Sequence, residues 1–287
     1  MKTHVYKRRA GIDLEADVYL PRETNGPVPV VVSLHGGALI MGSRSGVDAR
    51  LSEILLERGI AIVSPDYRLA PETKLPEIWR DVEDVFTWIR EQGPSLFGAD
   101  PQRIGVHGTS AGGYLALLAG CRIDPRPRVV GAYAGYGDIT GDWYAMPSEW
   151  YRTQGMVDRD EAHSTVGQNV PVHDATGLDR GKYYLYLRQQ GLWPREVSGL
   201  ECDDLRAYCP TRLVTTTYPP AVLYHGKADH DVPHEQSAEF VDRLSELGVE
   251  HEFVSLNGVD HVFCGGSESD VEDVHRTTSS FLIKYLS

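Results

Sequence analysis

The fold of this chain is decided by residues 104–118, which read IGVHGTSAGGYLALL. Ile104–His107 is a short apolar run typical of a buried strand, and Tyr114–Leu118 carries apolar residues at helical spacing. Between them stands Ser110, within the pattern G-x-S-x-G. A serine on such a sharp strand-to-helix turn has a strained backbone that only small neighbours permit, and its hydroxyl is lifted above the sheet edge. This stretch therefore predicts a nucleophilic serine at the carboxyl end of a strand.

Short apolar runs alternate with longer helical segments on both sides of this turn, which is the pattern of a mostly parallel sheet covered on both faces. Strands are expected near Val5, near Val18 and at 30–34, 61–64, 104–107, 129–134, 221–225 and 252–256. Helices are expected at 51–57, 82–90, 114–119, 235–247 and 271–285. We therefore predict an α/β fold with an eight-stranded, mostly parallel, doubly wound sheet.

Residues 139–217 break this alternation, because they contain many Trp and Tyr residues but no clear β run. So long a connection inside a compact domain is usually a lid or a subdomain. We predict one catalytic domain, formed by residues 1–138 and 218–287, with 139–217 inserted as a cap. Trp143, Trp150 and Trp193 either contact the substrate or give the insertion its own small core, and the second interpretation is favoured for any one of them.

Composition narrows the range of partners. The 287 residues carry a formal net charge of −13, which repels nucleic acid and anionic membranes, and the basic N-terminus is not followed by the apolar run of a signal peptide. No apolar stretch approaches the length of a membrane span. We expect a soluble, cytoplasmic protein with reduced thiols, although a bridge between Cys202 and Cys209 stays open, as does a homodimer. His230 and His234 have the spacing of a helical metal pair, but Pro233 lies between them, so we expect no metal.

A nucleophilic serine needs hydrogen-bond donors aimed at the developing oxyanion. His35-Gly36-Gly37 follows the strand expected at 30–34. Glycine amides can approach a substrate carbonyl closely, so Gly36 and Gly37 are candidate donors together with the amide of Ala111. Without the serine motif, the same three residues would fit a simple tight turn equally well.

The serine also needs a base, and the base needs a carboxylate that fixes its tautomer. Asp229 follows the seventh expected strand and His261 follows the eighth, which gives the chain order Ser, Asp, His. Asp231 and Asp260 are also near enough to serve as the acid. Asp260 is the least expected, because a side chain adjacent to the histidine on a loop generally points away from it.

With these residues in place, the chain resembles the bacterial esterases of the hormone-sensitive-lipase type, within the α/β-hydrolase superfamily. The matching motifs are H-G-G at 35–37, D-Y-R-L-A-P-E at 66–72, G-T-S-A-G-G at 108–113, D-x-x-V-P at 229–233 and H-x-F at 261–263. The resemblance implies that hydrolysis needs no cofactor and proceeds through an acyl-enzyme on a small-molecule ester with a short acyl or small aromatic group. It also implies the catalytic triad Ser110, Asp229 and His261, and the oxyanion donors Gly36, Gly37 and Ala111. We expect residues 66–72 to brace the loop that contains His35-Gly36-Gly37, which we call the oxyanion loop.

Two features depart from the family pattern. Ala38 stands where many members have a third glycine, which affects the shape of the oxyanion loop. The segment before His35 is too short for the family's N-terminal cap helices, so the insertion at 139–217 is expected to roof the pocket. Two alternative functions stay open: an arylformamidase-like amidase, which shares a similar turn and triad, and a non-catalytic ligand receptor built on the same fold.

Overall fold

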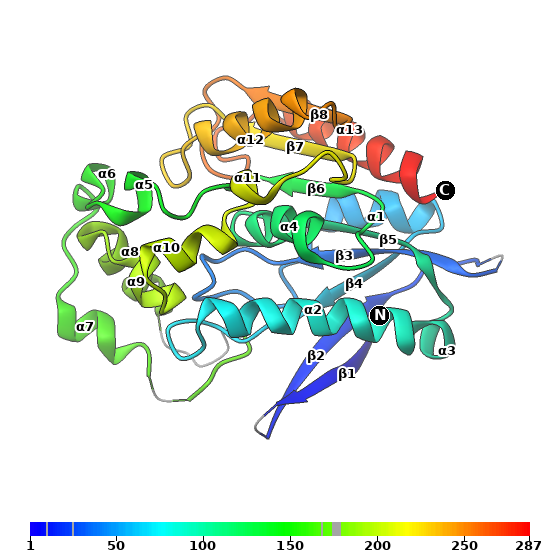
Figure 1. The fold of residues 1–287 in the computed structure, drawn as a ribbon, viewed down its shortest axis with the longest axis horizontal. Helices are drawn as coiled ribbons and strands as arrows, with labels where there is room; N and C mark the ends of the chain where they lie inside the picture. The colour runs from blue at the N-terminus through cyan, green and yellow to red at the C-terminus, as the bar shows by residue number, and fades with distance from the viewer. Residues whose placement is uncertain (10, 25, 168, 174–178) are drawn as a thin grey trace.

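The computed structural model describes residues 1–9, 11–24, 26–167, 169–173 and 179–287, apart from the side chain of Cys202. Its centre is an eight-stranded sheet in the order β1-β2-β4-β3-β5-β6-β7-β8 (Figure 1). The strands are β1 (Lys2–Arg9), β2 (Ile12–Tyr19), β3 (Val28–Leu34), β4 (Ala61–Pro65), β5 (Ala99–Thr109), β6 (Val130–Tyr133), β7 (Ala221–Gly226) and β8 (His251–Leu256). The pairs β1–β2 and β2–β4 are antiparallel, and all other neighbours are parallel. The prediction of an eight-stranded, mostly parallel α/β sheet is confirmed.

Helices cover both faces of this sheet (Figure 1). Outside residues 139–217 they are α1 (Ala49–Glu57), α2 (Leu75–Glu91), α3 (Gly93–Phe97), α4 (Ala111–Arg122), α12 (Glu235–Glu246) and α13 (Glu268–Leu286). Alternate residues of β3 pack into hydrophobic cores on opposite faces of the sheet. Val30 and Val32 pack with α2 and α4, whereas Val31 packs with α1 and α13. In the described residues, no helix is both long enough and apolar enough to cross a membrane.

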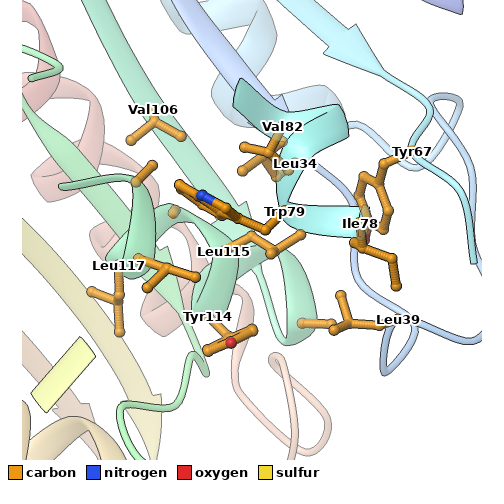
Figure 2. Packing of buried hydrophobic residues seen from close by; sticks show 14 of the residues in the cluster. Leu34, Leu39, Tyr67, Ile78, Trp79, Val82, Val106, Tyr114, Leu115 and Leu117 are labelled. Carbon is orange, nitrogen blue, oxygen red and sulfur yellow. The ribbon is translucent and has the colours of Figure 1, made fainter. Parts of the chain in front are cut away.

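The core between α2, α4 and the sheet holds the turn that carries Ser110. Trp79 of α2 is buried in the same cluster as Leu34 and Val106 from the strands and Leu115 from α4 (Figure 2). Ten consecutive residues of α4, from Ala111 to Gly120, are buried. Because α4 is enclosed in this way, its first turn is fixed relative to the ends of β3 and β5.

The start of α2 differs from the sequence-based expectation of 82–90. The helix begins seven residues earlier, at Leu75, with Pro76 in its first turn. Proline is favoured there, because its missing N–H would have no partner inside the helix and its φ is already helical. The early turns bury Ile78 and Trp79, so tertiary packing extends the helix beyond the segment of clearest apolar spacing.

The described part of residues 139–217 folds into short helices and contains no strand. They are α5 (Asp142–Ala145), α6 (Glu149–Arg152), α7 (Arg159–Ser164), α8 (Arg180–Gln190), α9 (Trp193–Ser198), α10 (Cys202–Leu205), η1 (Arg206–Tyr208) and α11 (Pro210–Leu213). Tyr144 stacks on Trp143 with ring centroids 3.7 Å apart and on Trp193 with centroids 4.1 Å apart. Tyr144 and Trp193 are buried and both contact the ring of Tyr136, which precedes the insertion, so they belong to the same buried cluster as the core between α2, α4 and the sheet.

Candidate active site

The candidate site lies at the carboxyl ends of the parallel strands of the sheet, the edge where open α/β sheets bind ligands. The loops after β3, β5, β7 and β8 meet there around a cavity of about 260 Å³. Its lining residues are Gly36, Gly37, Ala38, Met41, Thr109, Ser110, Tyr184, Asp231, His261 and Val262. A larger hollow of about 770 Å³ lies beside the end of β2 and α1, and none of the candidate site residues lines it.

Ser110 sits on a strained turn between β5 and α4, with φ 55° and ψ −119°. Two flanking glycines make this turn possible. A Cβ on Gly108 would come within 2.1 Å of the Gly112 carbonyl oxygen, and a Cβ on Gly112 within 2.0 Å of the Leu34 carbonyl oxygen. The Ser110 amide donates a 2.7 Å hydrogen bond to the Tyr133 carbonyl, which holds the turn against β6. The spacing G-x-S-x-G therefore follows from backbone contacts that a side chain would block.

Ser110, His261 and Asp229 form one continuous hydrogen-bonded chain. The His261 Nδ1 atom lies 2.7 Å from Asp229 Oδ2, and His261 Nε2 lies 3.1 Å from Ser110 Oγ. Because an ionised carboxylate only accepts, Nδ1 carries the proton of the neutral imidazole and Nε2 accepts from the serine hydroxyl. The other Asp229 oxygen accepts from the amides of Asp231 and Val232, at 2.9 and 2.8 Å. The three residues expected from the sequence are thus brought together.

The surroundings of Asp229 and His261 shift the pKa values of both side chains. Burial raises the pKa of Asp229, but hydrogen bonds from His225, His261 and the Val232 amide outweigh it and hold that pKa well below its usual range. Burial lowers the pKa of His261, but the hydrogen bond to Asp229 and the charges of Asp231, Asp229 and Asp260 outweigh it and raise that pKa above its ordinary value. The carboxylate therefore stays ionised at neutral pH, and the imidazolium is stabilised when it forms.

His225 is a site residue that sequence reasoning did not identify. It is fully buried at the end of β7, and its Nε2 lies 3.0 Å from the Val232 carbonyl and 3.2 Å from Asp229 Oδ2. Since both of these groups are acceptors, Nε2 carries a proton, and Nδ1 lies 2.7 Å from the Ser237 hydroxyl oxygen. His225 thus donates a second side-chain hydrogen bond to Asp229. Its place directly before Gly226, at the end of a buried strand, was the available sequence signal.

The backbone around Gly36, Gly37 and Ala111 is arranged as an oxyanion site requires. Ala111 begins α4, so its amide has no acceptor within the helix. A Cβ on Gly36 would lie 3.4 Å from Ser110 Cβ, and Gly37 has φ +107° with no room for a Cβ beside the Met41 carbonyl. Among the residues that the structure describes, the amides of Gly36 and Gly37 donate no hydrogen bond. All three amides are therefore free to bind a ligand atom near Ser110.

Ala38, the departure from the family's third glycine, adopts a left-handed backbone with φ 55°, and Leu39 follows with φ 62°. This conformation costs an L-residue about 1–2 kcal/mol, so neighbouring contacts must hold it. The Trp193 indole donates to the Ala38 carbonyl at 3.0 Å, and the Ala70 amide donates to the Leu39 carbonyl at 2.8 Å. The oxyanion loop is therefore held by both the insertion and residues 66–72.

The segment 66–72 contacts this loop at several points. Tyr67 donates to the His35 carbonyl at 2.8 Å and stacks on the His35 ring with centroids 4.1 Å apart. Glu72 pairs with the buried Arg180 of α8. Residues 66–72 therefore contact the oxyanion loop, which is the position that the expected bracing role requires.

The other two carboxylates considered for the triad have different neighbours. Asp260 accepts from the backbone amides of His230 and His261, at 2.9 and 2.7 Å, and therefore fixes the loop. Asp231 lies on the opposite side of the imidazole from Asp229, with its Oδ2 3.5 Å from His261 Nε2. Of the three, only Asp229 is placed to hold the Nδ1 proton.

Two further points from the sequence concern a metal site at His230 and His234 and a bridge between Cys202 and Cys209. His230 Nδ1 faces Asp260 and His234 Nε2 faces Ser255, so these two histidines do not converge. The described residues contain no group of three or more His, Cys, Asp or Glu side chains suited to a metal. Cys209 is a free thiol, whereas the side chain of Cys202 lies outside what the structure describes.

The insertion contributes less to the pocket than expected. Of the described residues that line the 260 Å³ cavity, only Tyr184 comes from 139–217, and none of the tryptophans in that segment lines it. For any one of the tryptophans, the sequence favours a packing role over substrate contact, and the structure buries Trp193 completely in the main hydrophobic cluster. Tyr184 carried no distinguishing signal among the many tyrosines of this segment.

Comparison with known proteins places this geometry in a family. Among solved structures, the chain is similar to a protein of unknown function from Staphylococcus aureus subsp. aureus Mu50, with a TM-score of 0.83, 22% identity and 100% of each chain covered. It is also similar to propionate-bound esterase 2 of Thermogutta terrifontis, with a TM-score of 0.69 and 20% identity over 99% of this chain and 93% of that one. At these identities, the two structures show a shared fold.

Two curated relatives are longer than this chain. Non-reducing polyketide synthase Preu6 of Preussia isomera is 30% identical over 301 residues, which cover 92% of this chain but 14% of the synthase. Probable isoprenylcysteine alpha-carbonyl methylesterase ICMEL1 of Arabidopsis thaliana is 27% identical over 280 residues, which cover 90% of this chain and 52% of the relative. A family model described as alpha/beta hydrolase fold matches residues 31–265. The chain therefore belongs to the α/β-hydrolase fold family, as its sequence motifs predicted.

Proposed function

We propose that the chain is a serine hydrolase that cleaves small carboxylic esters, with short acyl or small aromatic groups, through an acyl-enzyme intermediate. One observation carries this proposal: Ser110 Oγ, the His261 ring and the Asp229 carboxylate form a single hydrogen-bonded chain that opens onto a cavity. A serine hydroxyl is a weak nucleophile unless a base removes its proton, and this arrangement provides the base and its orienting carboxylate.

In the acylation step, Ser110 Oγ attacks the ester carbonyl carbon while His261 Nε2 takes the hydroxyl proton. The carbonyl oxygen becomes an oxyanion, which the amides of Gly36, Gly37 and Ala111 and the N-terminus of α4 stabilise. The imidazolium then gives its proton to the leaving alkoxide as the carbon–oxygen bond breaks. The ionised Asp229 favours this cycle, because it holds the productive tautomer and stabilises the imidazolium.

The size and lining of the cavity support small substrates. Its volume of about 260 Å³ is below the range typical of drug-sized ligand sites. Ala38, Met41 and Val262 give it apolar walls beside the nucleophile. The names of two similar proteins, a methylesterase and an esterase bound to propionate, support an ester with a small group on one side of the scissile bond.

The decisive test is the Ser110→Ala variant, assayed with p-nitrophenyl acetate and with a fluorophosphonate probe. We expect wild-type protein to release p-nitrophenol and to bind the probe covalently, and the variant to do neither while keeping its circular dichroism spectrum. The Gly108 and Gly112 contacts shape the turn without the hydroxyl, so the variant should fold. Retained turnover, or labelling of another serine, would contradict the assignment, and turnover of an N-formyl anilide without turnover of the ester would replace the ester with an amide.

A further inference from the structure

Asp231 is held in the candidate site by three donors that all bind the same oxygen. The Tyr151 hydroxyl and Arg188 Nη1 each donate to Asp231 Oδ1 at 2.7 Å, and the Tyr184 hydroxyl donates to it as well. Arg188 Nη1 also donates to the Asp231 backbone carbonyl at 2.9 Å. The Arg188 side chain is only 3% exposed and lies over the Tyr151 ring at 4.7 Å. The carboxylate is therefore fixed in position and orientation.

The second oxygen of this carboxylate is left facing the reacting groups. Asp231 Oδ2 lies 3.5 Å from His261 Nε2, and the residue lines the same cavity as Ser110. Among the described residues, no side chain or amide donates a hydrogen bond to Oδ2. A carboxylate that served only to neutralise Arg188 could share both oxygens with the guanidinium fork, the usual bidentate geometry. Here the arginine and both tyrosines use Oδ1, which leaves Oδ2 as a free acceptor.

The side of the imidazole that Oδ2 faces determines what it can do. Asp229 already holds Nδ1, so Asp231 cannot be the group that fixes the tautomer. Nε2 is the atom that takes and gives protons during the reaction. A separation of 3.5 Å is too long for a good direct hydrogen bond and too short for a water to lie between the two atoms, but one water beside them can donate to both.

Resting on the proposed ester hydrolysis, we propose that Asp231 Oδ2 and His261 Nε2 together hold the water molecule that hydrolyses the acyl-enzyme. Once Ser110 Oγ is acylated, it no longer donates to Nε2, and a water can take its place. That water donates one hydrogen to Nε2 and the other to Asp231 Oδ2. Its oxygen lone pair is then directed toward the acyl carbonyl carbon beside the oxyanion donors.

The protons balance in this step. The water oxygen forms a bond to the acyl carbon while one of the water protons moves to His261 Nε2. The second proton stays on the attacking oxygen, hydrogen-bonded to Asp231, and becomes part of the carboxylic acid product. As the tetrahedral intermediate collapses, the bond between the acyl carbon and Ser110 Oγ breaks, and Nε2 returns its proton to that oxygen. Asp231 gains no proton, so its role is to position the nucleophile.

This geometry distinguishes water from an alcohol. Methanol has a single O–H, so when it donates to Nε2 it places a methyl group, and no donor, toward Asp231 Oδ2. A hydrogen bond to a charged group contributes about 1.5–3 kcal/mol, which corresponds to a factor of ten or more. Wild-type protein should therefore direct the acyl group to water much more strongly than a site without this acceptor.

The test is the partition of the acyl group between water and methanol in the Asp231→Asn variant. Because Tyr151, Tyr184 and Arg188 require an acceptor, they should bind the asparagine oxygen and turn its NH₂ group toward Nε2. With p-nitrophenyl acetate in aqueous methanol, the ratio of methyl acetate to acetate, measured by gas chromatography, should rise about tenfold over wild type. The partition ratio is set after acylation, so it does not depend on how fast p-nitrophenol is released.

Two further variants complete the experiment. Asp260→Asn removes another negative charge near His261 that does not face Nε2, and it should leave the partition ratio at the wild-type value. If Asp231→Asn does not fold because Arg188 loses its partner charge, the double variant Asp231→Asn/Arg188→Met removes both charges and should show the same rise. An unchanged ratio in a folded variant, or an equal rise in Asp260→Asn, would overturn the inference. Failure of wild-type protein to acylate Ser110 would instead contradict the proposed function.

Discussion

Arg180 joins the insertion to the oxyanion loop, and its replacement by methionine should reduce both stability and rate. Its side chain is 2% exposed, and that of its partner Glu72 is 8% exposed. Arg180 donates to both Glu72 oxygens, at 3.0 and 2.8 Å, to the Ile40 carbonyl at 2.6 Å, and to the Ala70 carbonyl. Removing one partner of a buried ion pair costs about 3–5 kcal/mol, so we expect the free energy of unfolding to fall by about that amount.

The loss of rate follows from what the Ile40 carbonyl holds. The amides of Ile40 and Met41 both donate to the Gly37 carbonyl, at 2.9 Å each, so Arg180 fixes the turn that presents the Gly37 amide. Removing one oxyanion donor outright costs about 10²–10³ in kcat, and a displaced donor should cost less, about tenfold. KM should change little, because the oxyanion forms only in the transition state.

Urea unfolding followed by circular dichroism, and steady-state kinetics with p-nitrophenyl acetate, measure the two effects. Lys182→Met is the matched control. Lys182 lies on the same helix as Arg180 and pairs with Glu161, and both of these side chains are more than 40% exposed. Surface pairs of this kind contribute at most about 1 kcal/mol. If Arg180→Met behaved like Lys182→Met in both assays, the coupling of α8 to the oxyanion loop would be refuted.

Several other perturbations also have defined outcomes. Asp229→Asn should lower kcat roughly 10⁴-fold, because the amide stabilises the wrong tautomer of His261; a loss below tenfold would point to another acid. Activity should rise with pH through one ionisation whose midpoint lies above 6.5, since the base must be neutral and the pKa of His261 is raised. The Asp231→Asn variant should lower that midpoint, because it removes a negative charge beside His261. Activity should be unaffected by EDTA. Ala38→Gly should raise the free energy of unfolding by about 0.5–1 kcal/mol, because glycine adopts the left-handed backbone without the Cβ penalty. Trp193→Ala should lower it by about 3–5 kcal/mol, because this ring is buried and its indole donates to the Ala38 carbonyl; a loss below about 1 kcal/mol in urea unfolding would contradict this.

The sequence was sufficient for the sheet and for the residues around the serine because both depend on local rules. A buried parallel strand reads as a short β-branched run, and the turn at Ser110 excludes side chains at Gly108 and Gly112. The order of Ser110, Asp229 and His261 along the chain places each of them after a different strand. Since parallel strands end at one edge of a sheet, this order implied that the three side chains would be close together.

The contacts that support the site could not be read in the same way, because they join segments far apart in the chain. Arg188 and Asp231 are an ion pair across 43 residues, and no local spacing connects an arginine in a helical segment to a carboxylate after a strand. His225 was read as part of a strand, although its side chain donates to Asp229. Asp231 was considered only as an alternative to Asp229, since the sequence gives no information on which ring nitrogen a carboxylate faces.

Helix α8 contacts the candidate site on two opposite sides, and this changes how the insertion should be understood. Through Arg180, it fixes the turn that contains Gly37, a proposed oxyanion donor, and through Tyr184 and Arg188 it fixes the Asp231 carboxylate beside His261 Nε2. A lid that opened to admit substrate by moving α8 would have to break both buried ion pairs at once, at several kcal/mol each. We therefore expect α8 to stay in place during turnover, so that substrate enters and leaves past other parts of the cavity wall.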